Sequence, residues 1–133
     1  MKTIFLGGTC NGSDWREKLI PLLKIDYFNP VVKDWTPECQ ARELEARAKS
    51  DYVLYVITPF MTGVYAIAEV VDDSNKRPDK TILCILESDG EYYMRKVFDR
   101  HVLKSLNAVK KLVINNGAKV FDSLEDIANF VNL

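Results

Sequence analysis

Two uninterrupted apolar runs constrain the fold of this chain more than any other feature. Residues 52–57 and 81–86 are rich in β-branched, aromatic and aliphatic side chains and contain no charged residue. A strand with one face in water alternates apolar and polar residues, whereas a strand covered on both faces is apolar throughout. The two runs therefore predict neighbouring strands of a parallel sheet that has helices on both sides.

Three shorter strands are predicted at residues 2–6, 25–28 and 119–121, which gives five strands that alternate with helices. Alternation of this kind produces parallel pairs joined by right-handed crossovers. The simplest arrangement is a doubly wound α/β fold, with three layers (α/β/α) and strand order 2-1-3-4-5. We expect residues 1–133 to form a single domain of this type.

Helices are predicted between the strands from helical spacing and from capping residues. The second helix is expected to turn Leu44 and Ala48 inward and Arg47 outward. The third is expected over about residues 64–74, followed by a polar helix end, and a longer one from 91 to about 107. The expected caps are Ser13 or Asp14, Thr36 with Pro37 behind it, Thr62, and Ser123.

Composition narrows the class of protein. Eighteen basic and 19 acidic residues give a net charge of −1, so nucleic acid is not an expected partner. Three cysteines without a Cys-x-x-Cys pair, and a single histidine, favour neither a disulfide framework nor a metal site. The apolar run at the N-terminus is too short for a signal peptide. Residues 52–71 contain a single charge and approach the length of a membrane span, but the turn expected at residues 58–63 divides them into two elements. We expect a cytoplasmic protein without a membrane span.

The loop after the first strand is the first candidate for ligand binding. Residues 7–13 are Gly-Gly-Thr-Cys-Asn-Gly-Ser. Glycines let backbone amides approach a ligand, although Ser13 stands where a Walker loop has its lysine. Ligands of doubly wound sheets bind where the winding direction reverses, so this loop and residues 58–63 should face each other. The alternative is a tight turn without a ligand. Candidate substrate-binding residues are Gly7, Gly8, Thr9 and Asn11 in one loop, and Thr58, Met61 and Gly63 in the other.

Glu69 is the leading catalytic candidate, because it is the only charged residue between residues 52 and 71. Tyr65 lies four residues earlier, so both side chains share one helix face and point toward the loop after the third strand. A carboxylate in an apolar, partly dry pocket can be tuned for nucleophilic or acid–base chemistry. The alternative is a surface glutamate at the edge of its helix.

Aromatic and polar residues also gather after the second strand, at residues 26–36. Trp35 or Phe28 could stack on a base, and Asn29 or Asp34 could bind a base or sugar hydroxyls. A loop whose aromatic residues cover the core is an equal alternative.

Taken in order, several segments resemble the nucleoside 2-deoxyribosyltransferase-like proteins. They are residues 2–9 (Lys-Thr-Ile-Phe-Leu-Gly-Gly-Thr), Asn29-Pro30, and residues 51–56 followed by Gly63-x-x-x-x-x-Glu69. The resemblance covers roughly the first 86 residues. It implies a flavodoxin-like fold and cleavage of the N-glycosidic bond of a deoxynucleoside without a metal or organic cofactor. The matching glutamate would attack the anomeric carbon, and the sugar would pass to another base or to water.

Two family features lack a counterpart in this chain. Phe5 occupies the position of a tyrosine that orients the nucleophile, and no aspartate precedes Glu69 closely. Tyr65 and Asp34 are candidates for the missing hydroxyl and acid. The resemblance also implies a homodimer or larger homo-oligomer, in which Asn129 or Asn132 could reach a neighbouring site.

Two functions of different classes follow from these observations. The first is an enzyme that transfers or hydrolyses the glycosidic bond of a nucleoside or nucleotide. The second is a non-catalytic nucleotide-binding or sensing module on the same scaffold. Flavin-based electron transfer is less favoured, because the first loop lacks a Ser/Thr-rich phosphate cradle.

Overall fold

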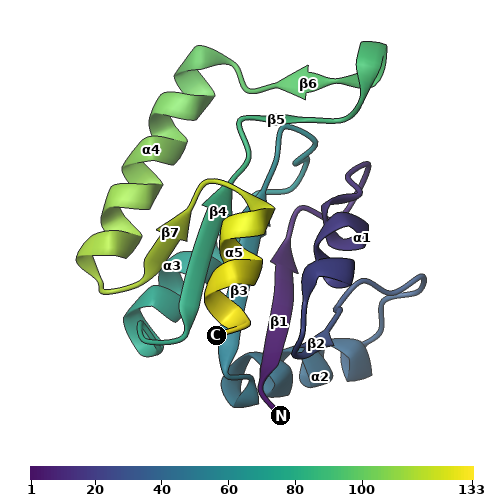
Figure 1. Ribbon diagram of the computed structural model, residues 1–133, viewed down its shortest axis with the longest axis vertical. Helices are drawn as coiled ribbons and strands as arrows, with labels where there is room; N and C mark the ends of the chain where they lie inside the picture. Colours follow the sequence, from purple (N-terminus) through teal and green to yellow (C-terminus); the bar gives the residue numbers. More distant parts are fainter.

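A five-stranded parallel sheet forms the centre of the protein (Figure 1). The computed structural model describes residues 1–133. In the order β2-β1-β3-β4-β7, every neighbouring pair is parallel. The predicted doubly wound α/β fold is confirmed, with β7 as the fifth strand of the sheet. The strands are β1 (Thr3–Gly8), β2 (Asp26–Phe28), β3 (Tyr52–Ile57), β4 (Thr81–Ile85) and β7 (Lys119–Phe121).

Helices cover both faces of this sheet (Figure 1). One face packs against α1 (Trp15–Leu19) and α5 (Leu124–Val131). The other packs against α2 (Pro37–Lys49), α3 (Tyr65–Lys76) and α4 (Arg100–Asn115). After α1 the chain continues as a short 3-10 helix, η1 (Ile20–Leu22), which contains Pro21. None of the helices has the combination of length and apolarity that a membrane span requires.

The central strands are buried on both sides, which explains their continuous apolar sequence. Along β3, Leu54 and Val56 face α1 and α5, while Val53, Tyr55 and Ile57 face the other helical layer. Each of these five side chains is at most 1% exposed. Because both faces are covered, only Tyr52 at the start of β3 remains partly exposed.

The prediction of a helix from residue 91 was wrong. Residues 88–97 instead form a small antiparallel ribbon, β5 (Ser88–Asp89) and β6 (Lys96–Val97), with a 3-10 turn, η2 (Tyr92–Met94), between them. The ribbon projects beyond the carboxyl ends of the central strands (Figure 1). Helix α4 begins only at Arg100, because the Asp99 side chain accepts a hydrogen bond from the His101 amide and caps the helix there.

Two of the other predicted caps are confirmed. Thr36 accepts from the Cys39 amide, and Ser123 accepts from the Asp126 amide. At α1 the N-cap residue is Asp14, whose side chain makes no capping bond, and Ser13 one residue earlier accepts from the Trp15 amide at 3.3 Å. Thr62 does not cap α3, which starts at Tyr65 without a side-chain cap.

The predicted inward face of α2 was also wrong. Leu44 is 55% exposed and Ala48 is exposed, whereas Arg47 is buried. The helix therefore turns a charged side chain toward α3 instead of the expected apolar pair. The contacts of Arg47 explain this orientation and are described below with the site.

Gly8 provides a test of the turn between β1 and the first loop. Its φ is +116°, and a β-carbon there would overlap the backbone of Val56 on the neighbouring strand. We expect Gly8→Ala to lower the free energy of unfolding by about 3 kcal/mol or more. Urea denaturation followed by circular dichroism measures this change.

Gly63→Ala is the matched control, because a β-carbon at Gly63 has no heavy atom within 4 Å and its backbone needs no positive φ. We expect its stability to stay within about 1 kcal/mol of the unsubstituted protein. Equal stability of the two variants would contradict the close approach of β1 to β3.

Candidate functional site

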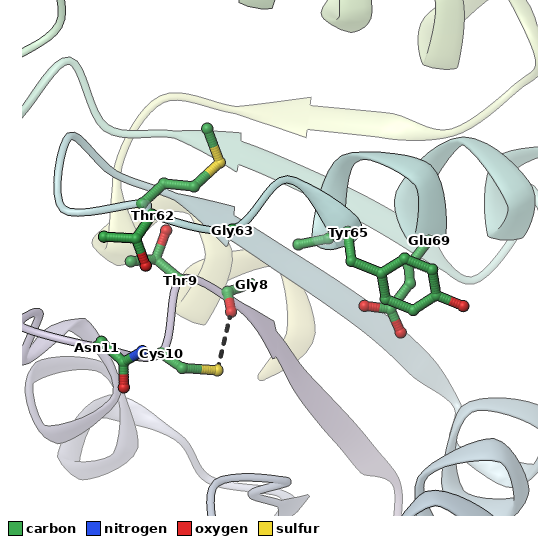
Figure 2. A pocket seen from close by; sticks show the side chains of 10 residues that line it. Gly8, Thr9, Cys10, Asn11, Thr62, Gly63, Tyr65 and Glu69 are labelled. Carbon is green, nitrogen blue, oxygen red and sulfur yellow. Dashed lines mark hydrogen bonds between the residues drawn. The ribbon is translucent and has the colours of Figure 1, made fainter.

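The loop after β1 and the loop after β3 face each other across a cavity at the carboxyl ends of these strands (Figure 2). The cavity has a volume of about 220 Å³. The expected meeting of the two loops at the reversal point of the sheet is confirmed. The lining residues are Gly8, Thr9, Cys10, Asn11, Met61, Thr62, Gly63, Tyr65, Ala66 and Glu69.

Hydrogen bonds from the first loop to β3 and to the second loop hold one wall of this cavity. The Thr9 amide donates to the Val56 carbonyl oxygen at 2.9 Å. The Thr9 side-chain oxygen accepts from the Thr58 amide at 3.0 Å. Thr58 is fully buried and supports the loop without lining the cavity. Gly7 also lies behind the wall, packed against the rings of Phe5 and Tyr55.

Arg16 holds the first loop in place by binding backbone carbonyl groups, a role that the sequence did not suggest. Its guanidinium is buried and donates to the Leu6 carbonyl through Nε and Nη2, at 3.0 and 2.9 Å. Nη1 donates to the Thr9 carbonyl at 2.7 Å. The same group stacks over the Trp15 ring, 4.3 Å from its centroid. Burial lowers the pKa of Arg16. With these bonds the loop is held rigidly before any ligand arrives.

Glu69 lies on the face of α3 that lines the cavity, opposite Gly8 and Thr9 (Figure 2). Its side chain is only 19% exposed, so it is not a surface glutamate at the edge of the helix. Tyr65, one turn earlier, also lines the cavity but is 71% exposed. The two side chains therefore share the cavity as their spacing predicted, with the carboxylate deeper than the phenol.

The nearest charged partner of Glu69 is Arg47 of α2, with Nη1 3.3 Å from Glu69 Oε2. Arg47 is in turn bound by Asp73 of α3, through Nε at 3.2 Å and Nη2 at 3.1 Å. Asp73 also accepts a hydrogen bond from the Tyr55 hydroxyl at 2.6 Å and pairs with Arg77. A buried charged network thus reaches from the core of the sheet to the cavity.

Burial and charge act in opposite directions on Glu69. Burial raises the pKa of the carboxyl group, the positive charge of Arg47 lowers it, and Glu43 and Asp73 raise it further, so the net shift is upward. Burial and the hydrogen bond to Asp73 likewise raise the pKa of Tyr55. Burial disfavours the charge on Arg47, but the hydrogen bond to Asp73 and the nearby negative charges raise its pKa overall.

Several predicted site residues lie outside the cavity. Asp34 and Trp35 are exposed and line no part of it. Asn29 lines a separate hollow near α2, and Phe28 stacks on Phe5 in the core.

The two asparagines near the C-terminus differ in what they can reach. Asn132 accepts a hydrogen bond from the Lys24 amide and donates to the Leu22 carbonyl. These two bonds engage its amide group within its own chain, and its reach into a second subunit remains a prediction. Asn129 is exposed, and its role remains a prediction. No three His, Cys, Asp or Glu side chains are close enough together to hold a metal ion.

Comparison with known families adds to this geometry. A family model described as nucleoside 2-deoxyribosyltransferase like matches residues 1–88 of the 133. The chain belongs to this family. The match runs from the N-terminus to β5 and includes every residue that lines the cavity. No curated protein matches the chain.

Membership in the nucleoside 2-deoxyribosyltransferase-like family confirms the resemblance noted in the sequence. It points to a nucleoside as the small-molecule ligand and to transferase-like activity. The structure adds a tyrosine hydroxyl close to the site, that of Tyr55 on β3, although it bonds to Asp73. One signal for Asp73 was present in the sequence, since it lies four residues after Glu69 on the same helix face. No comparable signal marks Arg47.

Asp73→Asn tests how strongly the buried network holds α2 against α3. The substitution leaves Arg47 and Arg77 facing a neutral amide in a buried position, so we expect a loss of about 3–5 kcal/mol in the free energy of unfolding. Chemical denaturation monitored by tryptophan fluorescence measures it.

Asp72→Asn is the control on the same helix. Its carboxylate is 43% exposed and pairs with Lys76 and Arg47. We expect a change of about 1 kcal/mol or less. If both variants lose the same stability, Asp73 has no special structural role.

Proposed function

We propose that this protein cleaves the N-glycosidic bond of a nucleoside or nucleotide, with Glu69 as the nucleophile and a covalent glycosyl-enzyme intermediate. One observation carries the proposal. In a chain of the nucleoside 2-deoxyribosyltransferase-like family, the Glu69 carboxylate lies largely buried in the cavity between the two loops at the reversal point of the sheet.

The chemistry proceeds in two displacements. In the first, an oxygen of the Glu69 carboxylate bonds to the anomeric carbon while the carbon–nitrogen bond breaks, and the base leaves with the electron pair. In the second, a water or another base attacks the same carbon and releases Glu69. Negative charge beside an oxocarbenium-like transition state stabilises it, and the effect is stronger in a partly buried site than in water.

The cavity supplies further groups for the substrate. Asn11 and Thr62 can bind sugar hydroxyls, while Met61 offers an apolar surface for the base. Tyr65 is our candidate for the hydroxyl that donates a hydrogen bond to the leaving base. Its position at the exposed edge of the cavity also suits a site that a second subunit completes.

The whole chain takes part in the proposed domain. β7 pairs with β4, and α5 packs on the face that carries α1, so the segment beyond the family match completes the same sheet and core. We therefore propose that residues 1–133 act as one nucleoside 2-deoxyribosyltransferase-like domain.

A non-catalytic nucleotide-binding module is the second candidate. It is favoured by the cavity lining, in which Glu69 is the only carboxylate. Without a second acid, the group that would protonate the leaving base must be a thiol, a phenol or water. If none of these three groups protonates the base, the protein would bind the nucleotide without turnover.

Glu69→Gln distinguishes the two functions. The amide keeps the shape of the side chain but is a poor nucleophile, so we expect base release to fall by about three orders of magnitude or more. Incubation with a panel of ribo- and deoxyribonucleosides and their 5′-phosphates, with free base measured by chromatography, provides the rates.

Glu45→Gln is the control, since Glu45 is exposed on α2 and pairs with Lys49. We expect it to leave base release unchanged. Full activity in Glu69→Gln would reject the nucleophile. Saturable binding by calorimetry, without base release from the unsubstituted protein, would instead support the binding module.

A further inference from the structure

Arg47 is a buried residue whose guanidinium contacts both Asp73 and the Glu69 carboxylate. It enters the space between α2 and α3 and is only 7% exposed. Two of its three nitrogens are committed to Asp73, Nε to Oδ2 and Nη2 to Oδ1, which is a bidentate arrangement. The third nitrogen, Nη1, contacts Glu69 Oε2 at 3.3 Å.

Asp73 is itself held firmly, so Arg47 has little freedom to move. Asp73 is fully buried, accepts the Tyr55 hydroxyl at 2.6 Å and pairs with Arg77. A guanidinium bonded twice to a fixed carboxylate has one orientation available. Because Oε2 of Glu69 is paired with Arg47, Oε1 is the oxygen left for a ligand in the cavity.

Arg47 is also the only cation in contact with Glu69. The other charged groups that act on the carboxylate are negative, namely Glu43 from α2 and Asp73 from its own helix. The remaining titratable groups that face the site are Asp72, the Tyr55 hydroxyl on β3, the Cys10 thiol in the first loop and the Tyr65 hydroxyl.

We propose that Arg47 is the positioning residue of this site: clamped by Asp73, it orients the Glu69 carboxylate so that Oε1 faces the substrate. This inference rests on the proposed function of Glu69. Arg47 touches no substrate atom and transfers no proton; it acts through Glu69. Its positive charge opposes the effect of burial and so keeps the pKa of Glu69 from rising further.

The effect of Arg47 changes with the charge on Glu69 during the two displacements. When Glu69 bonds to the anomeric carbon, its carboxylate becomes a neutral ester and the attraction to Arg47 weakens. When water attacks that carbon, the bond from carbon to the Glu69 oxygen breaks and the electron pair returns to the carboxylate. Arg47 then stabilises the recovered negative charge, which favours release of the sugar.

The test compares Arg47→Met, Arg47→Lys and the control Lys49→Met, an exposed residue two positions away on the same helix. The first measurement is the pKa of Glu69, from carbon-13 NMR of labelled glutamate carboxyls, with the resonance assigned by its loss in Glu69→Gln. The second is the pH profile of kcat/KM for base release. The NMR titration needs no activity.

In Arg47→Met we expect the pKa of Glu69 to rise, because the only contacting cation is gone. The acid limb of the kcat/KM profile should move to higher pH with it, since only the ionised carboxylate is a nucleophile. Arg47→Lys keeps a charge but cannot bond Asp73 twice while reaching Glu69. We expect it to lower kcat by about tenfold with a smaller shift of the acid limb. Lys49→Met should match the unsubstituted protein.

An unchanged Glu69 pKa and an unmoved acid limb in folded Arg47→Met would overturn the inference and leave the proposed function standing. If thermal unfolding shows that Arg47→Met does not fold, Arg47→Lys decides, and unchanged kcat in that variant overturns the inference. Absence of base release from the unsubstituted protein rejects the proposed function itself, and with it the positioning role.

Discussion

The pairing of β1 with β3 at the point where the sheet reverses direction is the constraint on which the rest of the structure depends. Gly7 lies opposite Tyr55 and Gly8 opposite Val56, and the pairing continues into the first loop through the Thr9 amide. Because β1 and β3 are neighbours, the loops that leave them meet over one cavity. Helix α3, which begins after the second loop, then brings Glu69 to the same place.

Much of this architecture could be predicted from the sequence, because apolar patterning reports burial directly. The continuous apolar run of β3 indicated a strand covered on both faces, and five predicted strands separated by helices left few arrangements. The opposing loops followed from the topology. Glu69 was predicted because a lone charge within a long apolar stretch is unusual. The start of α4 was missed, although Asp99 was available as its cap.

The buried charges could not be predicted in the same way. On its own helix, Arg47 belongs to a charged stretch that is typical of a solvent-facing surface, and Asp73 lies in a polar helix end. They are buried because α2 and α3 lie side by side, which brings opposite charges within hydrogen-bonding distance. Such pairing depends on tertiary structure, and the four-residue spacing of Glu69 and Asp73 on α3 does not indicate a partner on α2. The same holds for Arg16, whose partners are backbone carbonyl groups.

The central claim is that the Glu69 carboxylate, aimed into the cavity, bonds to the sugar during the reaction. The most direct measurement is mass spectrometry after incubation with a 2′-fluoro nucleoside, whose fluorine slows release of the sugar by destabilising an oxocarbenium-like transition state. The account predicts a fluorinated sugar adduct on the peptide that contains Glu69, with the bond at that residue. An adduct on any other side chain, Cys10 and Tyr65 included, would contradict it.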